Sequence, residues 1–409
     1  MDEFNTLSDT NFDNKIILLR VDFNLPLDRK TLDIIDDTRI KQVIPTIKEL
    51  IDKKAKLVII AHQGRKDSWD FISMNKHAKR LASLIGKDVI FIDDIYGDKA
   101  KKSINNLKDG EILFLDNVRK IPYETTTKSA EEHSHSEFVQ ELYPLLDYFV
   151  NDAFAAAHRS HCSLVGFTRV LPSFVGRLME REITQLNKII EKPTKPSVFL
   201  FGGAKFSDSI ITINRLLENQ IADKILLTGL PANAFLKSIG FNLGEKNEKM
   251  LLEEGNIEQF NEIKKIYEKY SESIFLPKDF AYSYNDKRFE ISIEDIPCEN
   301  NIYDIGEKTI NEYKEILKQA KTIFLSGPCG VFENDLFKKG TKEIFKFIAY
   351  IDAFSIAGGG HTVAAIEKLK LKDNFSHIST GGGSLEKYMM GDKLPAIEAL
   401  KASKNLFRL

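Results

Sequence analysis

The chain has 409 residues, of which 43% are hydrophobic and 29% are charged, as in ordinary globular proteins. Its 58 basic and 60 acidic residues leave a formal net charge of −2, so we expect no general attraction for nucleic acid or for an anionic membrane. At about 150 residues per domain, the length is too great for one core and predicts two or three domains.

The first half of the chain alternates short apolar runs with amphipathic stretches. Helices are predicted at residues 38–53 and 77–86, where apolar residues recur at helical spacing. Strands are predicted at residues 15–21, 57–61, 89–92, 112–115 and 148–151. These strands are nearly continuous runs of Val, Ile, Leu and Phe, the composition of strands buried on both faces of a parallel sheet. The pattern predicts a doubly wound α/β domain.

A charged helical stretch at residues 175–190 lies between Pro172 and Pro196 and ends near Pro193. Proline at both ends marks where a helix cannot continue. We interpret this stretch as the connection between two domains. The alternative is an ordinary surface helix of one large domain.

The second half resumes the alternation with strands predicted at residues 198–201, 224–228, 274–276, 322–326, 353–357 and 375–379. One charged helix is expected at residues 249–269 and a small peripheral sheet in the polar tract 282–301. Three strands run into glycine-rich turns, GGAK at 202–205, GGGH at 358–361 and GGGS at 381–384. Because ligands bind at the carboxyl ends of strands in open α/β sheets, these turns predict one nucleotide-binding edge. The sequence contains neither a Walker A pattern nor a G-x-G-x-x-G fingerprint.

The turn STGGGSLE at residues 379–386 is the strongest local signal. Gly381, Gly382 and Gly383 carry no Cβ, so their backbone amides can approach a ligand closely. A helix starting near Ser384 would add unpaired N–H groups and the positive end of its dipole. This arrangement suits an anion such as phosphate, although a tight strand-to-helix turn that binds nothing has the same pattern.

The three cysteines, Cys162, Cys298 and Cys329, have no paired spacing, so neither a disulfide framework nor a cysteine zinc motif is predicted. Residues 1–9 are acidic and polar, unlike a signal peptide, and no apolar run approaches the ~18 residues of a membrane span. We therefore expect a cytoplasmic protein in a reducing compartment.

Polar and charged side chains follow the predicted strands of the first half. They are Asp22, Asn24, Arg39, His62, Arg65, Arg119, His158, Arg159 and His161. If these segments share one edge of a parallel sheet, the four arginines and up to three histidines converge on one pocket. Arginine presents a rigid fork that matches carboxylate and phosphate, which favours a site for a small, multiply anionic ligand over separate surface salt bridges.

The spacing of His158, His161 and Cys162, with His133 and His135 upstream, also resembles that of metal ligands. Carboxylates in suitable positions are missing, so zinc is the weaker hypothesis. An imidazole beside a bound phosphate and a hydrogen-bonded structural histidine are the two alternatives that stay open.

Lys205 and Glu333 are the charged candidates of the second half. Lys205 ends GGAK at the start of the next predicted helix, where it can meet a transferred phosphoryl group as a mobile point charge. Glu333, in GPCGVFE, can accept the hydroxyls of a ribose or serve as an exposed carboxylate at a helix start.

Several motifs occur in order along nearly the whole chain: RVDFNLPLD, DDTRI, HQGR, DNVR, NDAFAAAHRSH, GGAKFSD, GPCGVFE, GGGHT and STGGGSLE. In sequence and order they resemble the phosphoglycerate kinases, and the spellings AHQGR and GGGHT are similar to the archaeal branch. The resemblance implies two Rossmann-like parallel-sheet domains that face each other across a hinged cleft. It implies an N-terminal 3-phosphoglycerate-binding domain of residues 1–174 with 395–409, an inter-domain helix at 175–193 and a nucleotide-binding domain at 194–394.

The resemblance also implies a reaction, reversible phosphoryl transfer between ATP and the carboxylate of 3-phosphoglycerate, with Mg2+ bound to the nucleotide. It implies phosphoglycerate binding by Asp22, Asn24, Arg39, His62, Arg65, Arg119 and Arg159. It implies nucleotide binding by Gly203, Lys205, Glu333, Gly359, Gly360, His361 and Thr362. The transferred group would be stabilised by Arg39, Lys205 and the amides of Gly382 and Gly383. The partners are then small-molecule substrates, and the chain would act as a monomer or a homodimer.

Some departures from the family pattern concern the nucleotide. Ser209 stands where many members have a second lysine, and His361 stands where many have an aspartate that reaches magnesium. Ser326 replaces the usual asparagine before Gly327, and GLPAN at 229–233 lacks the usual glycine pair. Because a neutral imidazole is a poor ligand for a hard cation, the sequence leaves the ligands of magnesium unassigned.

We therefore expect a kinase, and the alternative is a catalytically decayed nucleotide or anion sensor. Arg39, Lys205 and the STGGGS turn occur together, which favours the kinase because a pure binder would not need all three. Since the two substrates would bind to different domains, we predict hinge closure about residues 172–193 during turnover. Small-angle scattering with both ligands bound should show compaction, and unchanged dimensions would count against the hinge.

Overall fold

The computed structural model describes residues 3–407, and the chain divides into two compact units. The first unit comprises Met1–Thr184 with Lys393–Leu409, and the second comprises Gln185–Asp392. The division falls within the helix expected to connect two domains. Residues 1–2 and 408–409, which the predicted first domain includes, lie outside the described residues.

A seven-stranded sheet in the order β1-β7-β6-β2-β3-β5-β4 runs through the first unit, and all neighbouring strands are parallel. Its strands are β1 (Asn5–Thr6), β2 (Ile16–Arg20), β3 (Lys56–Ile60), β4 (Ile90–Ile92), β5 (Ile112–Leu115), β6 (Tyr148–Asn151) and β7 (Ser173–Val175). In β3, Leu57 and Ile59 join a core formed with α1 and α2, whereas Val58 and Ile60 join a core formed with α3 and α5. Helices therefore cover both faces of the sheet, as the apolar strands predict.

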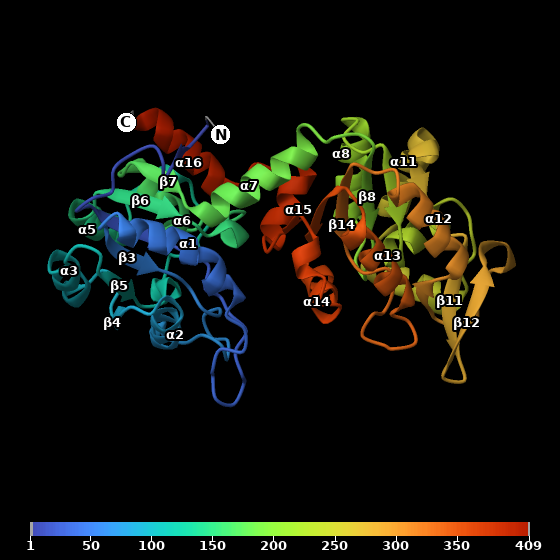
Figure 1. Ribbon diagram of the computed structural model, residues 1–409, viewed down its shortest axis with the longest axis horizontal. Helices are drawn as coiled ribbons and strands as arrows, with labels where there is room; N and C mark the ends of the chain where they lie inside the picture. The colour runs from blue at the N-terminus through green and yellow to red at the C-terminus, as the bar shows by residue number, and fades with distance from the viewer. Residues whose placement is uncertain (1–2, 408–409) are drawn as a thin grey trace. The chain divides into compact units, whose positions relative to one another are not determined.

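The helices of the first unit are α1 (Thr38–Asp52), α2 (Asn75–Ile85), α3 (Asp98–Asn105), α4 (Ala130–Ser134), α5 (Glu137–Leu142), α6 (Cys162–Val165), α7 (Arg177–Ile190), which continues into the second unit, and α16 (Pro395–Leu406). The C-terminal α16 lies beside α6 and β7 (Figure 1). Ala396 N donates to Ala157 O at 3.1 Å, and Ser403 Oγ donates to Leu171 O at 3.2 Å. The end of the chain is thus built into the first unit.

The second unit contains a six-stranded parallel sheet in the order β10-β9-β8-β14-β15-β16 and an antiparallel sheet in the order β12-β11-β13. The strands are β8 (Ser197–Phe201), β9 (Lys224–Leu227), β10 (Ile274–Phe275), β11 (Asp279–Tyr284), β12 (Lys287–Ser292), β13 (Ile302–Ile305), β14 (Thr322–Ser326), β15 (Phe354–Gly358) and β16 (His377–Ile378). The helices are α8 (Ser207–Glu218), α9 (Gly229–Ser238), α10 (Glu245–Glu254), α11 (Ile257–Tyr270), α12 (Glu307–Leu317), α13 (Lys339–Tyr350), α14 (Gly360–Lys368) and α15 (Gly383–Met390).

The predicted alternation of strands and helices is confirmed in both units, with two corrections. The edge strands β1 and β7 were not predicted, because two or three residues are too few to show a period. The single helix predicted at residues 249–269 is wrong, because the chain is extended at Gly255. Asn256 then begins α11 with a capping box, in which its side chain accepts from Gln259 N at 3.0 Å and its own N donates to Gln259 Oε1.

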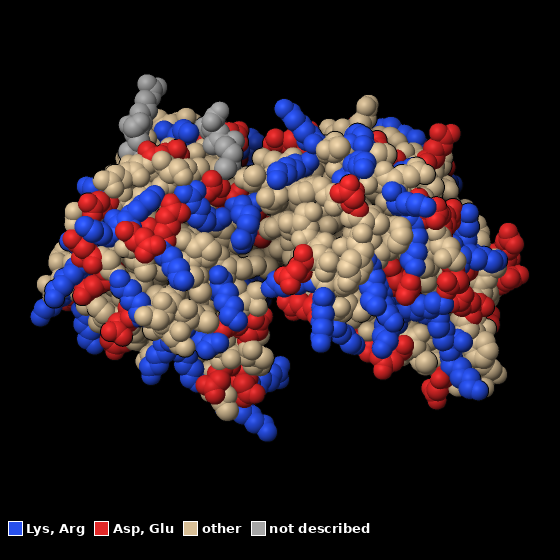
Figure 2. All heavy atoms as spheres, in the orientation of Figure 1, with Lys and Arg blue, Asp and Glu red and all other residues tan. Residues whose placement is uncertain are grey.

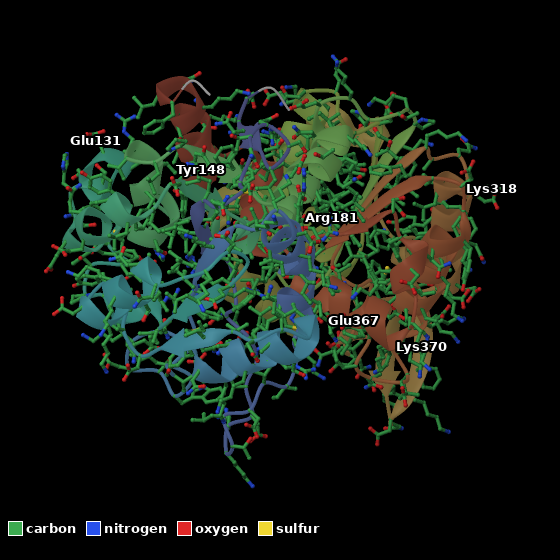
Figure 3. The ribbon with its side chains drawn as sticks, turned by 60° about the vertical axis from the view of Figure 1, so that its left-hand side comes forward. Glu131, Tyr148, Arg181, Lys318, Glu367 and Lys370 are labelled. Atoms are coloured by element: carbon green, nitrogen blue, oxygen red, sulfur yellow. The ribbon has the colours of Figure 1, made fainter. Side chains whose placement is uncertain are left out.

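Charged side chains of both signs are interspersed over the surface shown in Figure 2. Glu131, in α4, and Lys318, at the end of α12, point outward (Figure 3). Of the helices within residues 3–407, none combines the length and the apolar composition that crossing a membrane requires.

Candidate active site

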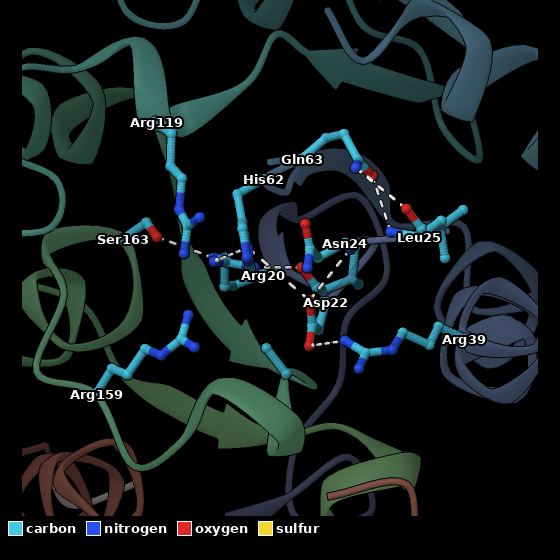
Figure 4. Close-up of polar contacts among 12 residues, drawn as sticks. Arg20, Asp22, Asn24, Leu25, Arg39, His62, Gln63, Arg119, Arg159 and Ser163 are labelled. Atoms are coloured by element: carbon cyan, nitrogen blue, oxygen red, sulfur yellow. Dashed lines mark hydrogen bonds and ion pairs between the residues drawn. The ribbon is translucent and has the colours of Figure 1, made fainter. Parts of the chain in front are cut away.

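The predicted anion-binding residues of the first unit follow four strands that are neighbours in its sheet. Asp22 and Asn24 follow β2, and His62 and Arg65 follow β3. The short helix η1 (Val118–Lys120), which holds Arg119, follows β5, and Arg159 comes after η3 (Phe154–Ala156), which follows β6. Because the strands are parallel, these segments emerge at one edge of the sheet, as Figure 4 shows.

Arg39 reaches this edge from the first turn of α1. Its Nη1 donates to Asp22 Oδ2 at 2.5 Å, and its side chain is 36% exposed whereas that of Asp22 is 10% exposed. Asn24 N donates to Asp22 Oδ1 at 3.2 Å, and Asn24 Oδ1 accepts from Gly64 N at 2.9 Å. Asp22 thus holds one arm of the guanidinium, which leaves donors of the other arm for an anionic ligand.

Arg119 and Arg159 point from opposite sides toward the space beside Arg20 and Asp22 (Figure 4). Arg119 Nη1 donates to Gly64 O, and Arg119 Nε is buried with no hydrogen-bond partner within residues 3–407. Burial, followed by the charges of Arg159 and Arg20, lowers the pKa of Arg119 to about 10. Several positive charges therefore lie close together in this pocket, which favours the binding of an anionic ligand.

Two histidines at this edge, His62 and His161, are held neutral. Burial, followed by the charges of Arg20 and Arg119, lowers the pKa of His62 well below 6.5. Burial, followed by the charges of Arg159 and Arg20, lowers the pKa of His161 to about 3. Near pH 7 both rings therefore act as uncharged hydrogen-bonding groups beside the arginines.

The zinc hypothesis finds no support in the packing of these histidines. Within residues 3–407, no three His, Cys, Asp or Glu side chains are grouped so that they could hold a metal ion. His133 Nε2 lies 3.1 Å from Thr126 O and 3.0 Å from Ser160 O, and Cys162 Sγ contacts Ser136 Oγ at 3.2 Å. His133 and Cys162 thus have structural partners.

Gln63 and Asn117 support this site and were not predicted. Gln63 Oε1 accepts from Leu25 N at 2.8 Å, and Gln63 Nε2 donates to Leu25 O at 3.1 Å. Asn117 Nδ2 donates to Gln63 O and to Ile72 O, each at 2.8 Å. Gln63 lies inside the HQGR motif and Asn117 inside the DNVR motif, and this motif membership is the sequence feature that could have indicated them. Arg65 lies at the same edge, but its side chain is exposed.

Three helices of the second unit begin at the carboxyl edge of its parallel sheet, namely α8, α14 and α15. A cavity of about 200 Å³ lies at their N-termini. Its lining includes Gly203, Lys205, Asp208, Ser209, Gly359, Gly360, His361, Thr362, Leu385 and Glu386. Helix N-termini present unpaired N–H groups and positive dipole ends, so the cavity suits phosphate groups.

Two glycines show why these turns need glycine. Gly382, which precedes α15, has φ 50°, a backbone conformation that favours glycine, and a Cβ built on it would meet nothing within 4 Å. A Cβ on Gly202 would lie 2.4 Å from Pro328 O, because the turns after β8 and β14 pack backbone to backbone. The first glycine leaves room for a ligand, and the second permits the close approach of two turns.

A second cavity of about 250 Å³ adjoins the first and shares Gly203, Ala204, Pro328 and His361 with it. Its further lining is mostly apolar and includes Leu230, Asn233, Met250, Phe280, Ile302, Tyr303, Val331 and Glu333. An apolar cavity beside a cavity lined by helix N-termini can hold a planar base and its phosphates. The lining residues come from seven separate segments, so the sequence alone could not group them.

The structure gives the predicted nucleotide residues different surroundings. Glu333 and His361 lie at the rim with side chains 58% and 81% exposed, and His361 Nδ1 is 3.7 Å from Glu333 Oε1. Thr362 is buried, and its Oγ1 accepts from Gly327 N at 2.7 Å. Thr362 therefore supports the turn after β14.

Two carboxylates that were not predicted, Asp208 and Glu386, line the cavity at the N-termini of α8, α14 and α15 together with Lys205, and we call this cavity the phosphate-sized cavity. Burial, followed by the charge of Asp208, raises the pKa of Glu386, and the charge of Lys205 opposes this shift. The three side chains are thus close enough to interact. Asp208 lies in the first turn of α8, Glu386 lies in the first turn of α15, and Lys205 lies just before α8.

Comparison with known proteins gives one consistent result. The profile of the family described as "Phosphoglycerate kinase" matches residues 7–392. The phosphoglycerate kinase of Methanothermus fervidus is 43% identical over 404 residues, which are 99% of this chain and 98% of the relative, and that of Pyrococcus abyssi is 41% identical over 98% of both chains. The crystal structure of phosphoglycerate kinase from Pyrococcus horikoshii OT3 has a TM-score of 0.89 at 40% identity, covering 98% of this chain and 100% of that one. The structure of the Coxiella burnetii phosphoglycerate kinase has a TM-score of 0.84 at 32% identity, covering 98% and 99%.

Proposed function

This chain belongs to the phosphoglycerate kinase family, and from that premise we propose how its own residues carry out the reaction. The enzyme is a phosphotransferase of glycolysis that moves a phosphoryl group reversibly between ATP and the carboxylate of 3-phosphoglycerate, giving ADP and 1,3-bisphosphoglycerate. The resemblance read from the motifs is confirmed, and the decayed-sensor alternative is not supported. We propose a cytoplasmic location, which the three free, buried cysteines favour.

The first unit is proposed to bind 3-phosphoglycerate through the residues at its sheet edge. The observation that carries this proposal is the excess of cations there, with Arg39 paired to Asp22 while Arg119 and Arg159 approach each other. A ligand that carries a phosphate and a carboxylate supplies the missing negative charge. The full proposed set is Asp22, Asn24, Arg39, His62, Arg65, Arg119 and Arg159.

The second unit is proposed to bind the nucleotide across its two adjoining cavities. The apolar cavity takes the base, with Glu333 at its rim available to the ribose hydroxyls. The cavity at the N-termini of α8, α14 and α15 takes the phosphates, next to Lys205. The proposed nucleotide set is Gly203, Lys205, Glu333, Gly359, Gly360, His361 and Thr362, with Thr362 acting through the turn that it supports.

The chemical step needs no protein nucleophile, because the acceptor is already a carboxylate. We propose that Arg39 neutralises charge on the phosphoryl group as it is transferred, that Lys205 moves with this group, and that the amides of Gly382 and Gly383 donate to its oxygens. Fixed donors aimed at the developing charge lower the barrier without reorganising in the step. A coupled assay of 3-phosphoglycerate-dependent ADP formation, run with and without magnesium, tests the scheme.

Magnesium would supply further positive charge at the nucleotide phosphates. Side chains near the proposed phosphate site could bind magnesium, but His361 is not a suitable ligand. Its imidazole is a poor ligand for a hard cation, and the side chain is 81% exposed beside Glu333. Asp208 and Glu386 offer carboxylate oxygens in the phosphate-sized cavity. Because Mg2+ in proteins is bound through one or two carboxylates together with substrate phosphates, we propose these two as its protein ligands, directly or through water.

Asp208→Asn and Glu386→Gln are each expected to weaken binding of ADP in the presence of magnesium about tenfold and to leave binding of ADP with the metal chelated unchanged. Isothermal titration calorimetry with magnesium or with EDTA measures both affinities. Glu253→Gln, which removes an exposed carboxylate from α10, is the matched control. Equal affinities for the three variants in magnesium would contradict this assignment.

A further inference from the structure

Arg20 is a buried cation beneath the phosphoglycerate edge. It is the last residue of β2 and only 1% exposed. Its Nε donates to Ser163 Oγ at 2.9 Å, its Nη1 donates to Val21 O, and its Nη2 lies 3.1 Å from His62 Nδ1 (Figure 4). Arg20 thus joins the strand end, α6 and the His62 ring.

The contacts behind Arg20 fix the direction of its hydrogen bonds. Ser163 Oγ donates to Glu124 Oε1 at 2.6 Å, and Ser163 N donates to Glu124 Oε2 at 2.8 Å. Because a hydroxyl has one proton, Ser163 must accept from Arg20. Glu124 is 1% exposed, and its charge favours the protonated form of Arg20. The chain of donors therefore runs from Arg20 through Ser163 to Glu124.

The chemistry of the guanidinium decides where the proton of His62 sits. Arginine has five N–H donors and no acceptor, so a ring nitrogen facing it must accept and cannot carry a proton. Around the ring, Arg20, Arg119, Arg159 and His161 all oppose a positive charge on His62. The facing acid is Asp22, whose Oδ1 is 3.9 Å from His62 Nδ1 and whose other oxygen accepts from Arg39.

We propose that Arg20 is a positioning residue that fixes His62 as the neutral tautomer with its proton on Nε2. His62 then presents an N–H donor at Nε2, so it serves as a donor to an anionic oxygen of the substrate and not as a base. This consequence rests on the proposed role of His62 in phosphoglycerate binding, whereas the tautomer itself does not. Donation from a neutral ring keeps substrate binding independent of histidine titration near pH 7.

The deciding experiment is an NMR spectrum of the full wild-type chain with ¹⁵N-labelled histidine rings. We expect His62, assigned by the signals lost in His62→Gln, to show a protonated Nε2 and an unprotonated Nδ1 from pH 5.5 to 8, with no titration. A ring with its proton on Nδ1, or one that titrates in this range, would overturn the proposal. Addition of 3-phosphoglycerate should shift the Nε2 signal, and a correct tautomer without this shift would refute only the binding role.

The Arg20→Gln variant provides a second test, because a glutamine amide can either donate to His62 Nδ1 or accept from it. We expect both tautomers of His62 in its spectrum, and a rise of about tenfold in KM for 3-phosphoglycerate with a much smaller change in kcat. Arg169→Gln, which removes a partly exposed arginine of the same unit, is the control. A folded Arg20→Gln variant with only the Nε2–H tautomer would overturn the proposal, and if this variant does not fold, the wild-type spectrum decides.

Discussion

Replacing Arg39 by alanine is expected to lower kcat about a thousandfold while the chain stays folded. Arg39 is 36% exposed, so its removal leaves little cavity, but it takes away a guanidinium that Asp22 holds at 2.5 Å and whose other donors are proposed to bind the ligand. Because the proposed role of Arg39 is to neutralise charge in the transition state, kcat should fall far more than KM for 3-phosphoglycerate rises. Steady-state kinetics in the coupled assay measure both quantities.

Two further variants test whether the effect depends on the charge of Arg39, on the planar shape of its guanidinium, or only on the total charge of α1. Arg39→Lys keeps the charge but loses the planar fork, so its kcat should fall between the wild-type and alanine values. Lys48→Ala removes an exposed cation from the same helix, and we expect wild-type kinetics. Full turnover by Arg39→Ala would show that the phosphoryl-neutralising role is assigned to the wrong residue. Thermal unfolding of each variant checks that Asp22 does not destabilise the chain when it loses its partner.

The parts of the site that the sequence could predict are those fixed by local order along the chain. Asp22, His62 and Arg119 each follow an apolar strand within a few residues, and parallel strands bring such positions to one edge whatever the details of packing. The turn before α15 was predictable for a similar reason, since consecutive glycines between a strand and a helix can adopt the positive φ values that tight turns require. In these cases the local pattern and the topology agree.

The remaining parts depend on contacts between residues far apart in the sequence. Arg20 begins the RVDFNLPLD motif and Glu124 lies in an irregular segment, and nothing in the sequence indicated that Ser163 connects them. Asp208 and Glu386 lie far apart in the chain and meet only because α8 and α15 pack together. The break at Gly255 was missed because charged residues on both sides continue the helical pattern. Such features follow from tertiary packing, which no short window of sequence contains.

Lys205→Ala is expected to lower kcat by a factor of about 10² to 10³ and to change the affinity for ADP much less. Lys205 lies between β8 and α8 and lines the phosphate-sized cavity, where its charge acts on Glu386. Because Ser209 stands where a second lysine is common in the family, this chain has one cation fewer at the proposed phosphate site. The loss of Lys205 should therefore leave the transferred group with Arg39 and backbone amides for neutralisation. Coupled assays give kcat, and calorimetry gives the affinity for ADP.

The control for Lys205 must remove the same charge from the same unit without touching the cavity. Lys318→Ala meets this requirement, because Lys318 ends α12 and points outward (Figure 3), and we expect wild-type kinetics. Adding Ser209→Lys to Lys205→Ala tests the same physics in the opposite direction, since a second cation on the first turn of α8 should restore part of the kcat lost in Lys205→Ala. If Lys205→Ala kept wild-type kcat, Lys205 would only be a solvated side chain at the cavity edge. Magnesium and the helix N-termini would then have to neutralise the nucleotide phosphates without it.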